Sequence, residues 1–350
     1  MILPQTYEWV LAVMILSLIC LGSWASTFKL AGKWRFELFY FDFAIGLILA
    51  AVIYGFTVGN LGFDGFSFLD DLMHAGKRQW LFGFLAGVIF NLANMLLMAA
   101  VSVAGMTISF PMTMGIAVLM ATGLSAISHQ AGNALLVGLG CLLLLASVVL
   151  NAASYRMIAF VRHEALARAG RAKSTRRPSS AKGILLALSS GVLMGSFSPL
   201  LEKASGGEIG MGPYALTGMF ALGVFFTTPI FSIFFMNLPV EGEPLELSNM
   251  FSTSLSQHLL GILGGVIWCT GVLAAMIVAS VPEQIQGGAV LRYMLRQAWP
   301  LVAALWGMLV FREFKGSDMA VKILGVLMMV LYLCGLGMIA LAPIYVAGKG

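Results

Sequence analysis

Charged residues are the scarcest class in this sequence of 350 residues. Asp, Glu, Lys and Arg make up only 10% of it, whereas an ordinary soluble domain carries roughly 25%. Hydrophobic residues make up 60%, and the mean hydropathy is +0.95. Such a chain cannot cover a soluble surface with polar groups, which excludes a globular cytoplasmic enzyme. The same composition excludes a disordered or fibrous chain.

Residues that carry enzyme or metal chemistry are also few. The four cysteines lie in apolar segments without a CxxC or Cys–His partner, so neither a disulfide framework nor a metal site is suggested (Cys20, Cys141, Cys269, Cys334). The four histidines are scattered through loops and segment ends, which leaves little chemistry for a membrane enzyme or a receptor-like scaffold (His74, His129, His163, His258). No GxxxxGK[ST] phosphate loop occurs, and hence nothing suggests an ATP-driven pump or a cofactor.

Long apolar runs dominate what is present. They recur with a length of about twenty residues, which is the length needed to cross a hydrocarbon core of roughly 30 Å. They predict an all-α polytopic membrane protein with ten spans, and the short loops allow nine or eleven as alternatives. The predicted spans are 9–29, 38–58, 80–101, 107–127, 134–156, 183–203, 213–236, 257–280, 290–311 and 320–342.

The formal net charge of +5 comes from basic residues between the spans, so it does not indicate a nucleic-acid partner. Lys and Arg are enriched in cytoplasmic loops of membrane proteins. Twelve of them fall in alternate loops that share one side: Lys29, Lys33, Arg35, Arg162, Arg168, Arg171, Lys173, Arg176, Arg177, Lys182, Arg312 and Lys315. The other side holds four: Lys77, Arg78, Lys203 and Lys349. This distribution predicts that both termini lie outside the cell.

Short motifs of the first half recur in the second half in the same order. The matched pairs are Gly22-Ser23-Trp24 with Gly195-Ser196-Phe197, Phe43-Ala44-Ile45-Gly46 with Phe220-Ala221-Leu222-Gly223, Gly87-Val88-Ile89-Phe90 with Gly265-Val266-Ile267-Trp268, and Phe110-Pro111 with Trp299-Pro300. We therefore predict a five-span repeat in residues 1–160, a basic cytoplasmic linker in 161–182 and a second repeat in 183–350. Because five is odd, the repeats are inverted, as in many secondary transporters. Chance similarity of apolar helices is the alternative.

Several of these motifs resemble a known family. Pro300-Leu301-Val302-Ala303-Ala304-Leu305-Trp306-Gly307, with Glu313 and Gly325 after it, resembles the drug/metabolite transporter superfamily. Gly22-Ser23-Trp24, Phe39-Tyr40-Phe41-Asp42, Asn94-Met95-Leu96 and Gly195-Ser196-Phe197-Ser198-Pro199 resemble its branch of ureide permeases and glucose/rhamnose uptake proteins. The resemblance covers nearly the whole chain. It implies a ten-helix carrier that moves a small polar metabolite, often with a proton.

Two amides and two tryptophans are the candidates for substrate contact. Asn91 and Asn94 lie near the middle of their span with a spacing that puts them on one face. Trp268, near mid-depth, offers a ring that could stack on a sugar or base, and Trp24 could line the pathway. The alternatives are hydrogen bonding between helices for the amides and plain packing for the rings. Pro111, Pro199 and Pro300 are expected to interrupt their helices.

Three charged residues near span ends complete the set of candidates. Asp42, about one turn inside the cytoplasmic end, is predicted to take up and release a proton, because an intramembrane carboxylate is costly to maintain without a function. The alternative is an ionised carboxylate paired with Lys29 or Arg35. Arg292 and Arg296 share one helix face at the outer end and are predicted to form an outer gate or to attract anionic or carbonyl groups; their alternative is contact with lipid headgroups.

The sequence thus predicts an integral protein of the bacterial inner (plasma) membrane that imports a small uncharged polar metabolite (a sugar, ureide or nucleobase) with protons. Its partners are the small-molecule substrate, the lipid bilayer and protons. A drug/metabolite-type exporter of hydrophobic or cationic compounds is the alternative. That function calls for a carboxylate at mid-depth, and the sequence places none there.

Overall fold

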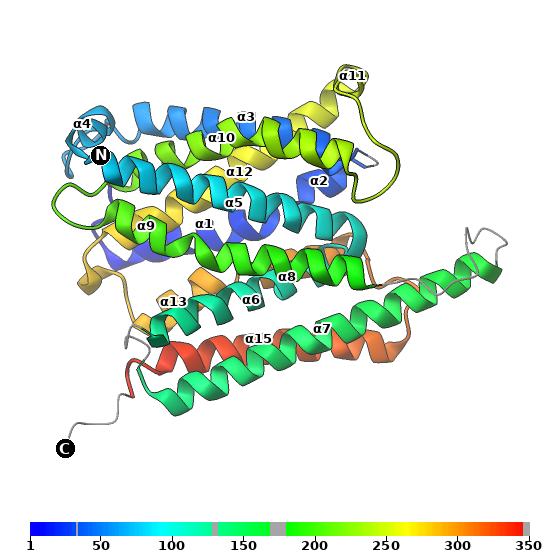
Figure 1. The fold of residues 1–350 in the computed structure, drawn as a ribbon. Coiled ribbons are helices and arrows are strands. Elements are labelled where there is room, and N and C mark those ends of the chain that lie inside the picture. Colours follow the sequence, from blue (N-terminus) through cyan, green and yellow to red (C-terminus); the bar gives the residue numbers. More distant parts are fainter. Residues whose placement is uncertain (33, 128–131, 169–179, 346–350) are drawn as a thin grey trace. The chain divides into compact units, whose positions relative to one another are not determined.

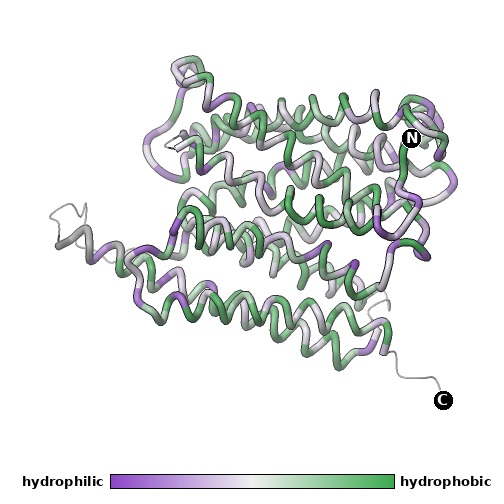
Figure 2. Tube along the Cα trace, turned by 180° about the vertical axis from the view of Figure 1, so that it is seen from behind, coloured by the Kyte–Doolittle hydropathy of each residue, from purple (hydrophilic) through white to green (hydrophobic). Residues whose placement is uncertain are grey.

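The computed structural model describes residues 1–32, 34–127, 132–168 and 180–345, and these residues form helices and loops without a strand (Figure 1). Within them, nine helices or broken helices are long and apolar enough to cross a membrane: Tyr7–Leu30, Phe36–Phe56, Lys77–Ala104, Met106–Ile127, Ala134–Val161, Ala181–Ser205, Pro213–Asn237, Leu255–Ser280 and Met319–Leu341. Hydrophobic residues follow the lengths of the helices, and hydrophilic ones gather in the loops and towards the helix ends (Figure 2). The predicted all-α membrane protein is confirmed.

The predicted ninth span, 290–311, differs from the structure. Helix α13 (Ala289–Gln297) ends before Ala298, and a separate apolar helix follows, made of α14 (Trp299–Leu305) and the π-helical turn η2 (Trp306–Val310). The physical reason is Pro300, which has no N–H and whose ring clashes with the preceding turn. The twelve residues of Trp299–Val310 rise only about 18 Å, too little to cross the core unaided.

Two further spans are broken near their ends. The first consists of α1 (Tyr7–Ser23) and α2 (Ser26–Leu30), and the sixth consists of α8 (Ala181–Ser196) and α9 (Ser198–Ser205). Pro199 lies in the first turn of α9, as expected for a residue that interrupts a helix. The expectation for Pro111 is wrong, because α6 (Met106–Ile127) continues through it. Proline in the second turn of α6 removes a single hydrogen bond, and the helix retains its other turns.

The helices group into two compact units, each of which draws on both halves of the sequence. Unit 1 comprises Met1–Met95 and Ser196–Val302, and unit 2 comprises Leu96–Gly195 and Ala303–Gly350. The units therefore do not follow the predicted repeats 1–160 and 183–350, which stay a prediction. Much of the basic linker, residues 169–179, lies outside the described residues.

Unit 1 is built from α1, α2, α3 (Phe36–Phe56), α4 (Phe68–His74), the first part of α5 (Lys77–Ala104), α9, α10 (Pro213–Asn237), α11 (Ser248–Phe251), α12 (Leu255–Ser280), η1 (Glu283–Ile285) and α13. Helix α3 packs against both α10 and α12, and α1 packs against α12. All residues predicted to bind substrate or protons, or to guard the outer side, lie in this unit.

The crossing of α3 and α12 depends on two glycines. A Cβ atom on Gly46 would overlap the carbonyl oxygen of Ile262, and one on Gly265 would overlap the carbonyl oxygen of Phe43. The two backbones are thus in direct contact. Small residues permit this approach in membrane helices, where packing and not water exclusion drives association.

The crossing of α5 and α10 has the same construction. A Cβ atom on Gly87 would overlap the carbonyl oxygen of Phe220, and one on Gly223 would overlap that of Phe84. Both crossings thus place a glycine of each helix directly against a carbonyl of the other.

Unit 2 contains the end of α5, α6, α7 (Ala134–Arg168), α8, the rest of α14, η2 and α15 (Met319–Leu341). Helix α7 packs along α15 and α6. The carboxylate of Glu313 accepts hydrogen bonds from the backbone N–H groups of Met106 and Thr107, at 2.9 and 2.8 Å, and from the Thr107 hydroxyl at 2.7 Å. These donors lie in the first turn of α6, so the negative charge of Glu313 lies at the positive end of the helix dipole.

We expect Glu313→Gln to lower the free energy of unfolding by about 1–3 kcal/mol, because charge-assisted hydrogen bonds at the start of α6 are lost. The measurement is unfolding of the purified protein in detergent. The matched control is Asp318→Asn, since Asp318 precedes α15 but its side chain makes no capping hydrogen bond. Equal stability of the Glu313→Gln variant and the parent protein would contradict the capping role.

Candidate functional site

Asn94 and Tyr40 form a buried polar pair between α5 and α3. The Asn94 amide donates a hydrogen bond to the Tyr40 hydroxyl at 2.8 Å. Among the described residues, the amide oxygen of Asn94 and the hydroxyl proton of Tyr40 have no partner. The pair therefore joins two helices and retains one acceptor and one donor that a polar ligand could use.

Asn91 is engaged differently, although sequence spacing put it on the same face as Asn94. Its amide donates towards Val224 O, Thr227 Oγ1 and Thr228 Oγ1 on α10, at 3.1, 2.8 and 3.1 Å. Its oxygen accepts from the Thr228 hydroxyl at 3.4 Å. These contacts occupy both ends of the amide, so they favour the alternative of a hydrogen bond between helices. Substrate contact by Asn91 stays a prediction.

Trp268 lies midway along α12 and is buried among phenylalanine rings. Its ring centroid is 4.4 Å from that of Phe90 and 5.6 Å from that of Phe220, with only 16° between the planes of Trp268 and Phe220. Phe43 approaches from α3 at 6.2 Å. Three helices besides α12 thus contribute a ring to one cluster: α3, α5 and α10.

Phe43 extends this cluster to the other predicted residues. Its ring centroid is 4.9 Å from those of both Trp24 and Tyr40. We call Trp24, Tyr40, Phe43, Phe90, Phe220 and Trp268 the aromatic cluster. The structure therefore brings together Trp24, Trp268 and, through Tyr40, Asn94, three of the four residues predicted to bind substrate. All six rings are buried, so the cluster is closed in this conformation.

Asp42 is paired with a histidine from another helix. Its Oδ2 lies 2.6 Å from Nδ1 of His258, three residues into α12, while Nε2 of His258 lies 3.2 Å from the carbonyl oxygen of Met250. Of the two cations offered as alternative partners, Lys29 and Arg35, the structure pairs Arg35 with Glu37, while Asp42 bonds to His258. The side chain of Asp42 is 6% exposed and that of His258 is 24% exposed.

The imidazole of His258 lies between two acceptors, the Asp42 carboxyl group and the carbonyl oxygen of Met250. The carbonyl of Met250 can only accept, so a hydrogen bond there requires a proton on Nε2 of His258. The short contact between Nδ1 and the Asp42 carboxyl then requires a second proton, which lies either on the imidazole or on the carboxyl group. A buried carboxyl group and a part-exposed imidazole are thus joined across α3 and α12.

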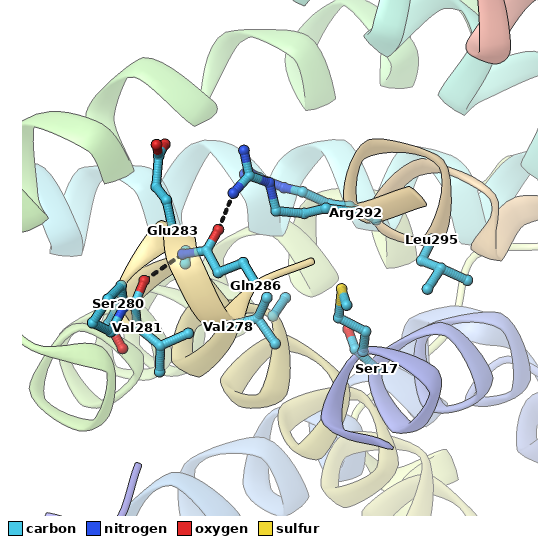
Figure 3. A pocket seen from close by; sticks show the side chains of 13 residues that line it. Ser17, Val278, Ser280, Val281, Glu283, Gln286, Arg292 and Leu295 are labelled. Carbon is cyan, nitrogen blue, oxygen red and sulfur yellow. Dashed lines mark hydrogen bonds between the residues drawn. The ribbon is translucent and has the colours of Figure 1, made fainter. Parts of the chain in front are cut away.

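Arg292 and Arg296 line a cavity of about 490 Å³ at the other end of α12 (Figure 3). We call it the outer cavity. Its lining residues come from α1, the end of α12, η1 and α13: Met14, Ser17, Ala275, Val278, Ala279, Ser280, Val281, Pro282, Glu283, Gln286, Arg292, Leu295 and Arg296. The guanidinium of Arg292 donates to the side-chain oxygen of Gln286, whose amide donates to the backbone of Val281.

Sequence reasoning missed the partners in these pairs. His258 and Tyr40 are separated from Asp42 and Asn94 by 216 and 54 residues, so no local spacing links them. Glu283 and Gln286 follow the end of α12 and have no pattern of their own. In the described part of the chain, no group of three or more His, Cys, Asp or Glu could hold a metal ion.

No known family model matches this sequence. Curated proteins do. Ureide permease 1 of Arabidopsis thaliana is 22% identical over 92% of this chain and 94% of its own length. Ureide permease 4 of the same plant is 24% identical over 93% and 95%, and ureide permease 2 is 22% identical over 91% and 93%. The chain is distantly homologous to these permeases, which confirms the resemblance to their branch and points to a transporter rather than an enzyme.

The bond between Asn94 and Tyr40 predicts a measurable coupling. In a double-mutant cycle of Asn94→Leu and Tyr40→Phe, we expect a coupling energy of about 0.6 kcal/mol and at most about 1.7 kcal/mol, the range for hydrogen bonds between membrane helices. Unfolding in mixed detergent micelles measures it. Tyr54→Phe is the control, because Tyr54 lies on the same helix but bonds to Thr270. Additive effects of Asn94→Leu and Tyr40→Phe would contradict the pairing.

Proposed function

We propose that this protein is a secondary active transporter that takes up a small polar metabolite (a sugar, ureide or nucleobase) together with protons. The observation that carries the proposal is the order of groups along α12. His258 lies at its start, Trp268 follows ten residues later, and Val278 of the outer cavity a further ten, so successive groups are about 15 Å apart. One helix thus connects a proton-binding pair, a buried cluster and a cavity. Distant homology to permeases supports the same conclusion.

The inverted repeat belongs to this proposal. Helix α1 ends at Ser23 and helix α8 ends at Ser196. These two serines occupy the same position in the matched motifs of spans one and six. The same motif matches relate the glycine contacts of one crossing to those of the other. Gly46 and Phe43 on α3 correspond to Gly223 and Phe220 on α10, and Gly265 on α12 corresponds to Gly87 on α5. Matched breaks and matched crossings support a common origin of the two halves.

In the proposed cycle, substrate enters the outer cavity and reaches the aromatic cluster when the cluster opens. The oxygen of Asn94 and the hydroxyl of Tyr40 would then bind its polar groups, and Trp268 would stack on its ring or face. The closed cluster separates the two sides of the membrane between cycles. We place the Asp42 end in the cytoplasm and both termini outside, following the loop charges.

Asp42 and His258 would couple the proton to this movement. Loss of the shared proton leaves the imidazole with one N–H for two acceptors, the Asp42 carboxylate and the Met250 carbonyl. When Nε2 retains that proton, the Nδ1 lone pair faces the carboxylate and repels it, so α3 and α12 would separate at this end. Rebinding of a proton would restore the contact. One proton is thereby exchanged at each opening and closing of the Asp42 end.

The substrate class is tested by thermal stabilisation of the purified protein with a panel of sugars, ureides, nucleobases and organic cations. A ligand at a hundred times its dissociation constant should stabilise the folded state by about 2.7 kcal/mol. We expect stabilisation by a neutral polar member of the panel. Stabilisation by organic cations alone would contradict the proposal and favour an exporter.

Proton coupling is tested in liposomes with the ligand that the panel identifies. We expect Asp42→Asn to abolish accumulation driven by a pH gradient and to retain thermal stabilisation by the ligand, because the Asp42 carboxyl group bonds to His258 and belongs to none of the groups proposed to bind the ligand. His258→Gln should change the pH dependence of uptake. The control is Asp70→Asn, an exposed carboxylate on α4. Undiminished proton-driven uptake by Asp42→Asn would refute the coupling role.

A further inference from the structure

The outer cavity is deep for a surface hollow. On α1 it reaches Ser17, ten residues or about 15 Å from the start of that helix. The hydroxyl of Ser17, which lines the cavity, donates to the carbonyl oxygen of Gly271 at 2.7 Å and so joins α1 to α12. Its volume lies within the range of about 300–1,000 Å³ that is typical of small-molecule sites. The cavity is therefore large enough for a small organic ligand.

The charges of the outer cavity favour an anion. Two guanidinium groups, of Arg292 and Arg296, and one carboxylate, of Glu283, give its lining one net positive charge. Within the described residues, the Arg296 side chain forms no hydrogen bond or ion pair. A guanidinium is always charged and presents a planar fork that matches a carboxylate. Arg296 is thus an exposed cation at the cavity that has no counterion in the described part of the chain.

The guanidinium of Arg292 is also positioned to bind an anion. Figure 3 shows its guanidinium reaching towards Gln286, which is itself buried and bonded to the backbone of Val281. One N–H of the fork is used in this way, and the others remain for a ligand. Because Arg292 and Arg296 are four residues apart on α13, they lie on the same helix face.

The remaining lining is largely apolar. Met14, Val278 and Leu295 contribute side chains from three different helices. The Ser17 and Ser280 hydroxyls already donate to backbone carbonyls, of Gly271 and Ile277. The cavity thus pairs a cationic end with an apolar wall, and this combination suits a carboxylate attached to a small hydrocarbon body more than it suits a sugar or a bare inorganic anion.

We propose that the outer cavity binds a small organic monocarboxylate through the guanidinium groups of Arg292 and Arg296. Its hydrocarbon part contacts Met14, Val278 and Leu295. The outer cavity is also the proposed entry route of the metabolite, but this inference concerns binding at the cavity itself, separate from the aromatic cluster. Its failure would leave the uptake and the Asp42 result untouched, because those experiments use a different ligand and different variants.

The test measures binding of benzoate and butyrate to the purified full chain in a neutral detergent without lipid. The readout is the rise in melting temperature over a range of ligand concentrations. Benzamide and butyramide are the matched neutral probes. We expect the amides to bind at least about tenfold more weakly than the acids, since a charge-assisted pair is lost. Equal binding of acids and amides, or no binding of the acids, would overturn the proposal.

The variants assign the site. We expect Arg296→Gln to weaken benzoate binding about tenfold or more, and Arg296→Lys to retain part of it. Arg78→Gln is the matched control, because Arg78 is exposed at the start of α5 and should leave binding unchanged. Each variant is first compared with the parent protein for its melting temperature without ligand. Unchanged benzoate binding by a folded Arg296→Gln variant would overturn the proposal.

A lipid headgroup offers similar negative charge, so phosphatidylglycerol and phosphatidylcholine are added separately in the same micelles. We expect benzoate to stabilise the protein in both. Stabilisation by phosphatidylglycerol that depends on Arg296, with none by benzoate, would show that the guanidinium groups bind headgroups and would overturn the carboxylate site.

Discussion

The close crossing of α3 and α12 is the contact on which the candidate site depends. Gly46 and Gly265 let the two backbones touch, and a side chain at either position would overlap a carbonyl oxygen. At one end of this crossing, Gly261 leaves room for Asp42, which reaches His258. One residue further along α3, Phe43 meets Trp268. A wider separation of the helices would break the proton pair and open the aromatic cluster together.

This common dependence gives the proposed transport cycle a physical basis. A buried carboxyl group, a part-exposed imidazole and a cluster of rings all respond to the distance between the same two helices. In the proposed cycle, protonation of the pair would favour close approach of the two helices, whereas a ligand among the rings would require their separation. The two events are linked because α12 carries both, and helices transmit such shifts over their length as nearly rigid bodies. The second crossing, of α5 and α10, positions Phe90 and Phe220, whose ring centroids lie 4.4 and 5.6 Å from that of Trp268.

Sequence reasoning succeeded where the signal is local. Apolar length predicted the membrane helices, and the short motifs indicated the permease branch before any comparison. It failed at the ninth span, where hydropathy predicted one continuous helix over 290–311, although the interruption expected at Pro300 is present between α13 and α14. It also overrated Pro111, since the effect of a proline depends on its position within a helix. For Asn91 and Asn94, spacing predicted one face, but each amide bonds to a different neighbour.

By itself the sequence determined that this is a membrane protein and where its spans approximately lie. It also identified the polar residues that are costly to bury: Asn91, Asn94, Asp42, Arg292 and Arg296. Hydropathy and burial cost act residue by residue, so they can be read along the chain. Only the tertiary structure decided which side chains these polar residues bond to. His258 for Asp42, Tyr40 for Asn94 and Gln286 for Arg292 follow from which helices cross and at what height. Two of these pairs join different helices, and all three depend on packing geometry, which no single segment contains.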